Sequence, residues 1–196
     1  MIDVTCVYED DPTYHVMLKM LGHFPDNLCV SRGIHCHGFG KIKKNIAGYN
    51  SAAMFSYFFV ITDLDRHECA PSLIREWLPA KRNLKLIFRV AVREVESWLL
   101  ADRENFARFF AVNPALVPFP PDEINDPKQV VFAIAKRSRK RNIREGIPPT
   151  DEYVSIGPGY NIEFRDFIKN YWSLGDARKN SPSLDKALKS LEKLPD

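Results

Sequence analysis

The sequence lacks several features that mark whole classes of protein. Its four cysteines have no CxxC spacing, and the N-terminal stretch MIDVTCVYEDD has no basic-then-apolar signal pattern. The apolar run MFSYFFVIT stops at Asp63, well short of the roughly 18 to 20 residues that a membrane helix needs. We therefore expect a cytoplasmic protein with no membrane partner.

Three well-known site patterns are also missing. The glycines around Lys41 do not have the spacing of a Walker loop, and no GK[ST] ends them, so any ATPase must be another chain. No HxE is followed by PCxxC, which argues against a zinc deaminase. The clusters at residues 35–37 and 67–69 contain histidine and cysteine but match no common zinc finger, so we expect buried thiols and solvated imidazoles there.

Composition and periodicity predict an α/β fold. A chain of 196 residues with 45% hydrophobic content can bury one good core, and its net charge of +3 says little about partners. Apolar runs and helical spacing alternate along the first half, which predicts βαβ units around a mostly parallel sheet. The predicted strands are Ile2–Tyr8, Phe55–Thr62 and Leu84–Val92, and the predicted helices between them are Thr13–Leu21 and Pro71–Leu78.

Two regions are predicted less sharply. Residues 27–50 contain four glycines and a lysine cluster, so we expect short strands mixed with an exposed loop. After the third strand, apolar spacing predicts one long helix over Glu94–Phe110, followed by a proline-rich connection and helices near residues 128–139, 162–172 and 183–194. The expected organisation is a core at residues 1–112 and a helical extension at 113–196 that packs on it as one structural unit.

Acidic residues follow each of the three predicted strands. Because the carboxyl ends of parallel strands line the crevice where ligands bind, we expect these carboxylates to converge. Converging carboxylates repel unless they share protons or hold a cation, and hard oxygen ligands favour Mg²⁺ or Mn²⁺ over zinc. Each acid alone has an alternative interpretation as a turn residue or helix N-cap. The acids are Glu9, Asp10 and Asp11, then Asp63 and Asp65, then Glu94 and Glu96.

An acid after a first strand, a DxD after a later hydrophobic strand and a further acid beyond it resemble the Toprim fold of topoisomerases, primases and the nuclease half of the overcoming-lysogenisation-defect family. The chain is also similar to small Toprim-like proteins of bacterial defence loci, which are encoded beside an ABC-type or AAA ATPase. The similar stretches are REVESWLLAD, DLD, INDPKQ, IGPGYN and SPSLDKAL, and they cover nearly the whole chain.

This resemblance implies a Toprim-like core and a metal-dependent endonuclease that acts as the effector of an anti-phage system with an ATPase partner. It implies Mg²⁺ or Mn²⁺ held by Glu9, Asp63, Asp65 and one of Glu94 and Glu96, the set that we also expect to be catalytic. Toprim proteins commonly carry glycine after the first glutamate, whereas Asp10 follows Glu9 here, so the first-strand ligand stays open. Two alternatives are a non-catalytic regulatory subunit of the ATPase and a hydrolase of small phosphate compounds.

Two basic segments are candidates for binding nucleic acid, either DNA or RNA and including tRNA. Six cations within nine residues exceed what a helix dipole needs, and such a patch grips phosphates beside a metal site; an acidic partner protein is the alternative. The segment GFGKIKKN is a second, flexible candidate. The number of copies that assemble stays open. The cations are Lys136, Arg137, Arg139, Lys140, Arg141 and Arg144 in the first segment, and Lys41, Lys43 and Lys44 in the second.

Asp102 and the stretch IGPGYN have structural interpretations. On the predicted helix Glu94–Phe110, Asp102 falls within the apolar stripe, where an unpaired carboxylate is unfavourable. We therefore expect it to pair with a basic partner or to cap a neighbouring loop. The stretch IGPGYN predicts a turn before a helix, with glycines chosen for backbone freedom.

Overall fold

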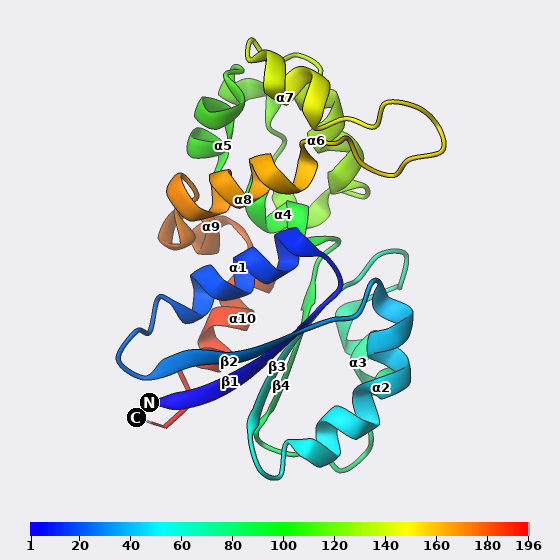
Figure 1. The fold of residues 1–196 in the computed structure, drawn as a ribbon, viewed down its shortest axis with the longest axis vertical. Coiled ribbons are helices and arrows are strands. Elements are labelled where there is room, and N and C mark those ends of the chain that lie inside the picture. Colours follow the sequence, from blue (N-terminus) through cyan, green and yellow to red (C-terminus); the bar gives the residue numbers. More distant parts are fainter. Residues whose placement is uncertain (196) are drawn as a thin grey trace. The chain divides into compact units, whose positions relative to one another are not determined.

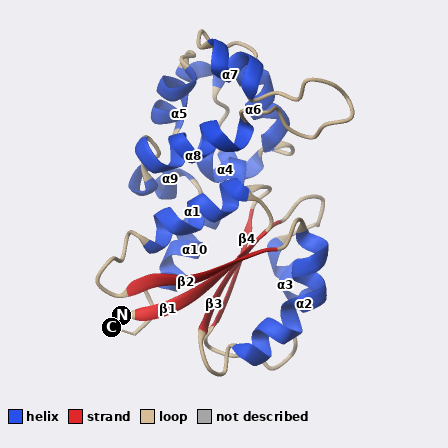
Figure 2. Ribbon diagram, in the orientation of Figure 1, coloured by secondary structure: helices blue, strands red, loops and turns tan. Residues whose placement is uncertain are grey.

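A four-stranded parallel sheet with helices on both faces forms the N-terminal part of the chain (Figure 1, Figure 2). The computed structural model describes residues 1–195. The sheet has the order β2-β1-β3-β4, and every neighbouring pair is parallel. The predicted α/β class is therefore confirmed, and the arrangement is consistent with the Toprim-like expectation. The strands are β1 (Ile2–Tyr8), β2 (Leu28–His35), β3 (Tyr57–Asp63) and β4 (Leu86–Ala91).

Helices connect the strands and make up most of the remaining chain. In the first half, helices follow each of the first three strands: α1 (Asp11–Leu21), α2 (Phe39–Ala52) and α3 (Ala70–Trp77). After the sheet come α4 (Val95–Leu100), α5 (Arg103–Phe110), α6 (Pro127–Ala135), α7 (Arg141–Gly146), α8 (Tyr160–Asn170), α9 (Leu174–Asn180) and α10 (Pro182–Leu191). Two short 3₁₀ helices, η1 (Pro114–Leu116) and η2 (Pro121–Glu123), lie in the proline-rich connection. No helix within residues 1–195 is long and apolar enough to cross a membrane.

The chain divides into two compact units. Unit 1 contains Met1–Val92 and the segment that begins at Asp185, and unit 2 contains Arg93–Leu184. The boundary expected near residue 112 therefore falls inside unit 2. The sheet and most of α10 belong to unit 1, whereas the acids Glu94 and Glu96 belong to unit 2.

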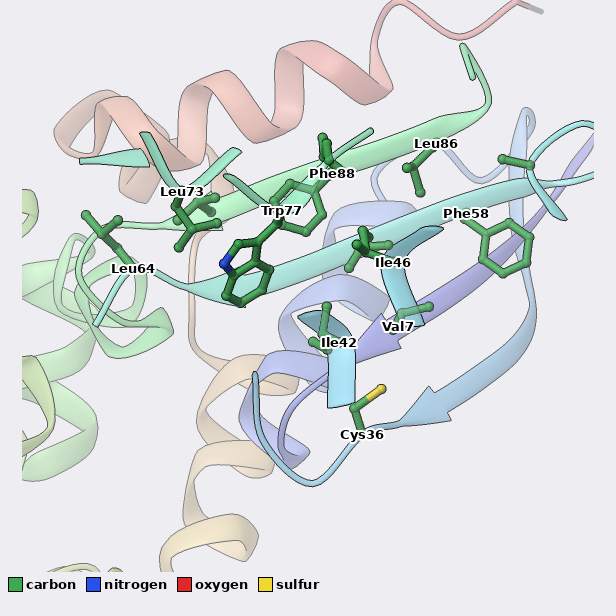
Figure 3. Close-up of a cluster of buried hydrophobic side chains, with 14 residues drawn as sticks. Val7, Cys36, Ile42, Ile46, Phe58, Leu64, Leu73, Trp77, Leu86 and Phe88 are labelled. Atoms are coloured by element: carbon green, nitrogen blue, oxygen red, sulfur yellow. The ribbon is translucent and has the colours of Figure 1, made fainter. Parts of the chain in front are cut away.

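The core of unit 1 lies on both faces of its sheet. Figure 1 shows α1 and α10 on one face and α2 and α3 on the other. On the second face, alternate residues of β3 and β4, among them Phe58, Val60 and Phe88, pack against Ile42 of α2 and Leu73 of α3 (Figure 3). The alternation follows from the two-residue period of a strand, and both central strands are buried over most of their length.

The prediction for residues 27–50 is wrong in one respect. The segment begins with the edge strand β2, but the lysine cluster lies on the 14-residue helix α2 and not in an exposed loop. The reason is packing: Ile42 and Ile46, four residues apart on one helix face, are buried in the unit 1 core. This burial overrides the low helix propensity of Gly40 and Gly48.

The prediction of one helix over Glu94–Phe110 is also wrong, because the chain forms two helices there. α4 ends at Leu100, and α5 begins at Arg103 with Asp102 as its N-cap. The apolar stripe continues across the break, since Trp98 and Phe106 are both fully buried in unit 2. Apolar periodicity therefore does not reveal the interruption.

Burial of the α3 face predicts a clear difference between two leucines. Leu73 is fully buried in the unit 1 core, whereas Leu84 is 95% exposed. We expect Leu73→Ala to lower the free energy of unfolding by about 2 to 5 kcal/mol, through lost apolar contact and a residual cavity. The same change at Leu84 should cost less than about 0.5 kcal/mol. Urea denaturation of the two variants checks this, and equal losses would contradict the assigned core.

Candidate functional site

Glu9 lies at the point where the two central strands of unit 1 end. The parallel register pairs Val7 of β1 with Val60 of β3, so the residue after β1 reaches the last residues of β3. There, Oε1 of Glu9 accepts a hydrogen bond from the Thr62 hydroxyl and one of 3.2 Å from the backbone N–H of Asp63. Glu9 therefore lies beside the backbone of Asp63 at the end of β3, and the convergence of the carboxylates themselves stays a prediction.

The environment of Glu9 disfavours its charged form. Burial raises the pKa of Glu9 to about 7, and the charges of Asp65 and Asp10 add to the increase. The hydrogen bonds from Thr62 and Asp63 oppose it. A carboxyl with this pKa is partly protonated near neutral pH. A bound cation would stabilise the charged form and favour loss of the proton.

The loop that follows β3 is fixed between its two acids. Leu64 is buried in the unit 1 core, and its N–H donates to the carbonyl of Ala91 over 2.9 Å. Asp65 then adopts a left-handed backbone with φ of 49°. Aspartate tolerates this conformation better than most residues, and strained positions of this kind occur often at functional sites.

Asp10 and Asp11 take the structural role of helix-start residues. Asp10 is the N-cap of α1, and its side chain accepts hydrogen bonds from the N–H and the hydroxyl of Thr13 at 3.0 and 2.6 Å. Asp11 occupies the first turn of α1, where a negative charge suits the helix dipole. Of the acids after β1, Glu9 is therefore the one directed at the neighbouring strand.

Histidines and tyrosines stack beside Glu9 at the ends of β1 and β2. Tyr8 stacks on Tyr14 and on His35, with ring centroids 4.4 and 5.2 Å apart, and His35 lies 3.8 Å from His37. Nε2 of His35 is 2.9 Å from the backbone carbonyl of Glu9. The rings pack closely over Gly33, because a Cβ at this position would lie 3.2 to 3.3 Å from atoms of both tyrosine rings.

Glu94 and Glu96 form a second acidic group, which belongs to unit 2. Glu94 precedes α4 and accepts a 2.9 Å hydrogen bond from the backbone N–H of Lys128. Burial raises the pKa of Glu94 to about 7, and the charge of Glu96 adds to the increase, whereas Lys128 opposes it. Glu96 is 1% exposed and lies 3.4 Å from Nζ of Lys128.

Tyr160 completes this buried group in unit 2. Its hydroxyl donates to Oε1 of Glu96. Tyr160 begins α8 directly after IGPG, and the glycines are needed for close approach, because a Cβ at Gly157 would lie 2.3 Å from two backbone oxygens. Lys128 and Tyr160 lie in the stretches INDPKQ and IGPGYN, but no pattern in the sequence indicated that they meet Glu96.

Asp102 has a capping role, as one of its two sequence interpretations predicts. Its carboxylate accepts hydrogen bonds from the side chain of Asn105 at 2.9 Å and from the backbone N–H of Ser173 at 2.6 Å. The second bond ties the start of α5 to the start of α9 within unit 2. A similar capping contact joins Asp122 to Ser183 of the stretch SPSLDKAL.

The two predicted basic segments keep exposed cations, although several of these also make local contacts. In unit 2, Arg141 pairs with Glu145 and Lys140 lies over the ring of Phe109. Arg144 donates to the backbone of the same segment. On α2, Lys43 pairs with Glu76. Arg139 donates from Nε to the backbone carbonyl of Ala111 over 3.3 Å. The other cations of the two segments, all exposed, are Lys136 and Arg137 in unit 2 and Lys41 and Lys44 on α2.

The donors in unit 1 fit a hard divalent cation by their chemistry. Among residues 1–195, no three histidine, cysteine or acidic side chains are placed as a set that could hold a metal ion. The side chains that do approach one another are carboxylates, which suit Mg²⁺ and Mn²⁺. Burial is the main cause of the raised pKa of Glu9, and the charges of Asp65 and Asp10 add a smaller part that a cation would relieve.

Comparisons of the chain with protein-family models, with curated proteins and with solved structures give no match. The Toprim-like resemblance therefore remains a prediction that rests on the sequence motifs.

The raised pKa of Glu9 predicts a pH-dependent stability. Its folded pKa of about 7 exceeds the ordinary 4.5, so its contribution to stability is present below pH 4.5 and is lost as the pH rises through 7. In EDTA, the free energy of unfolding of the wild type should fall as the pH rises from about 5 to about 8. We expect this fall to be about 2 kcal/mol smaller in Glu9→Gln, which has no carboxyl to ionise at this position. Chemical denaturation at both pH values measures this difference. The exposed Glu68→Gln is the control, and a Glu9→Gln curve parallel to wild type would refute the environment assigned to Glu9.

The buried contact between Tyr160 and Glu96 predicts an effect that depends on one hydroxyl. Tyr160→Phe removes the donor to a carboxylate that is 1% exposed, so we expect unfolding of unit 2 to become easier by about 1 to 3 kcal/mol. Tyr153→Phe is the matched control, because Tyr153 is 89% exposed. Thermal unfolding of both variants tests the contact, and equal stabilities would contradict it.

Proposed function

We propose that the chain is a metal-dependent nuclease that serves as the effector of a bacterial anti-phage system with an ABC- or AAA-type ATPase partner. The observation that carries the proposal is the position of Glu9. This carboxyl reaches from the end of β1 to the end of β3, and the charge of Asp65 adds to its raised pKa. Ligands of open α/β sheets bind at such strand ends.

In this proposal Glu9, Asp63 and Asp65 hold Mg²⁺ or Mn²⁺. The bound ion would supply charge stabilisation at a phosphate and a lower pKa for an attacking water. The residues of the chain have separate tasks. Thr62 and the backbone N–H of Asp63 orient the Glu9 carboxylate, and the buried Leu64 keeps Asp63 and Asp65 at the strand end.

Within unit 2, Glu94 and Glu96 differ in their local contacts. Glu96 is almost fully buried and already contacts Lys128 and Tyr160. Glu94 is half-buried, and its raised pKa means that a cation bound there would have to displace a proton. We assign to Glu96 and Tyr160 the task of orienting Lys128 and the start of α4.

The exposed cations support a nucleic-acid substrate over a small phosphate compound. Lys136 and Arg137 lie together at the end of α6, and Lys41 and Lys44 lie on one exposed side of α2. Phosphate contacts from such residues give affinity that falls steeply with salt and carries no sequence information. We therefore expect cleavage with little sequence preference, of DNA, RNA or tRNA.

A cleavage assay with matched variants tests the proposal. We expect the double variant Asp63→Asn/Asp65→Asn to lose at least about 100-fold in cleavage of DNA, RNA or tRNA with Mg²⁺ or Mn²⁺. The double variant Asp11→Asn/Asp26→Asn is the control, because it removes two exposed acids of unit 1. The assay is run with and without the neighbouring ATPase, since activity that needs the partner is otherwise missed.

Melting temperatures measured with and without the metal ion test metal binding separately from cleavage. Mg²⁺ or Mn²⁺ should raise the melting temperature of the wild type and of the control double variant, and should leave that of Asp63→Asn/Asp65→Asn unchanged. Equal cleavage by the two double variants would remove the proposed site. Absence of any cleavage by the wild type, with the ATPase bound, would favour the regulatory-subunit alternative.

A further inference from the structure

Unit 1 has a groove at the end of the sheet opposite to Glu9. It has a volume of about 460 Å³ and lies between the amino-terminal half of β4 and the segment at the end of α10. Figure 3 shows α10, in faint red, alongside β4, and the two are joined where Nε of Arg89 donates to the Ser190 hydroxyl over 2.9 Å. We call it the β4 groove.

Four cations line the β4 groove, and among residues 1–195 no aspartate or glutamate does. They are Arg82, Lys85, Arg89 and Lys193. Within residues 1–195, no aspartate or glutamate forms a salt bridge with any of the four. Burial lowers the pKa of the Arg89 guanidinium, and the nearby charge of Arg82 lowers it further, so these cations repel one another. A site of this kind is complementary to a negatively charged ligand.

Apolar side chains make up much of the rest of the β4 groove. Leu84, 95% exposed, lies at its rim, and Leu194 and Pro195 lie on the opposite side. Lys85 does not extend freely into solvent, because its Nζ lies 5.5 Å from the ring centroid of Tyr57. A bare phosphodiester chain would leave these apolar walls unused, whereas a peptide that combines carboxylates with an apolar side chain would contact both kinds of wall.

We propose that the β4 groove binds an extended acidic segment of a partner protein, with an apolar side chain of that segment packed against Leu84 and Tyr57. The volume is within the range of about 300 to 1,000 Å³ that is usual for ligand pockets. The carboxylates of the bound segment contact Arg82, Arg89 and Lys193. This surface is independent of the proposed chemistry, because it lies at the starts of β3 and β4, whereas Glu9 and Asp63 lie where the strands end.

A fluorescence anisotropy titration of the full chain tests this proposal. The probe is a fluorescein-labelled peptide of alternating glutamate and leucine, about ten residues long. We expect saturable binding that weakens with salt and that falls at least about tenfold in Arg82→Glu/Lys193→Glu. The control double variant Arg75→Glu/Lys186→Glu makes the same change in net charge at exposed positions outside the β4 groove and should bind as the wild type does.

A second variant tests the apolar part without a risk to folding. Leu84→Ser changes a side chain that is almost fully exposed, and we expect it to weaken peptide binding about threefold or more. A peptide with glutamine in place of glutamate should bind neither the wild type nor Leu84→Ser. Failure of the wild type to bind the probe, or equal affinities of the two double variants, would overturn the proposal. So would tighter binding of an oligothymidylate that is lost in the β4 groove variant, since the surface would then serve nucleic acid.

Discussion

The parallel pairing of β1 with β3 is the constraint on which the candidate site depends. The register places the residue after Tyr8 beside Thr62 and Asp63, so a half-buried carboxylate lies where Thr62 and the N–H of Asp63 are its hydrogen-bond donors. Such a carboxylate is unfavourable when charged. The fold tolerates it because the apolar core between the sheet and its helices holds the strands on either side. This core does not depend on which residue occupies position 9.

The central strands could be predicted from the sequence because their burial is nearly complete. Ile2–Tyr8 and Tyr57–Asp63 are runs of β-branched and aromatic residues, and such runs have few alternatives. β2 was harder, since Ser31, Arg32 and Gly33 leave the middle of this edge strand exposed and polar. The helix α2 was missed because two buried isoleucines decide its structure, and their partners come from distant strands.

Of the candidate site, only the acids at the strand ends could be predicted from the sequence. Glu9, Asp63 and Asp65 follow directly from the rule that the carboxyl ends of parallel strands meet. The partners of these acids could not be found in this way. Thr62, for example, donates to Glu9, but in the sequence it is indistinguishable from the other β-branched residues of the strand. The same applies in unit 2, where Glu96, Lys128 and Tyr160 are separated by long stretches of chain and are joined only by tertiary packing. Apolar periodicity likewise continued through Ala101 and Asp102, although the helix does not.

The buried polar contacts of unit 2 differ in kind from the carboxylates of unit 1. Asp102 and Asp122 each accept backbone N–H groups from segments far along the chain, and both thereby hold the C-terminal helices. Capping of this type contributes stability. An acid in the stretch REVESWLLAD therefore has to be assigned by its contacts, since Asp102 and Glu94 belong to the same stretch and make different contacts.

Leu64 has a consequence for any ion that binds between its neighbours. Because this side chain is inserted in the core and its amide is bonded to β4, the backbone between Asp63 and Asp65 is held at the strand end. For the proposed Mg²⁺ or Mn²⁺ ligands, this would leave little conformational entropy to be lost on association. The affinity of the proposed site would then depend on the dehydration of the ion and the carboxylates, and its selectivity on how far the loop accommodates one ionic radius over another.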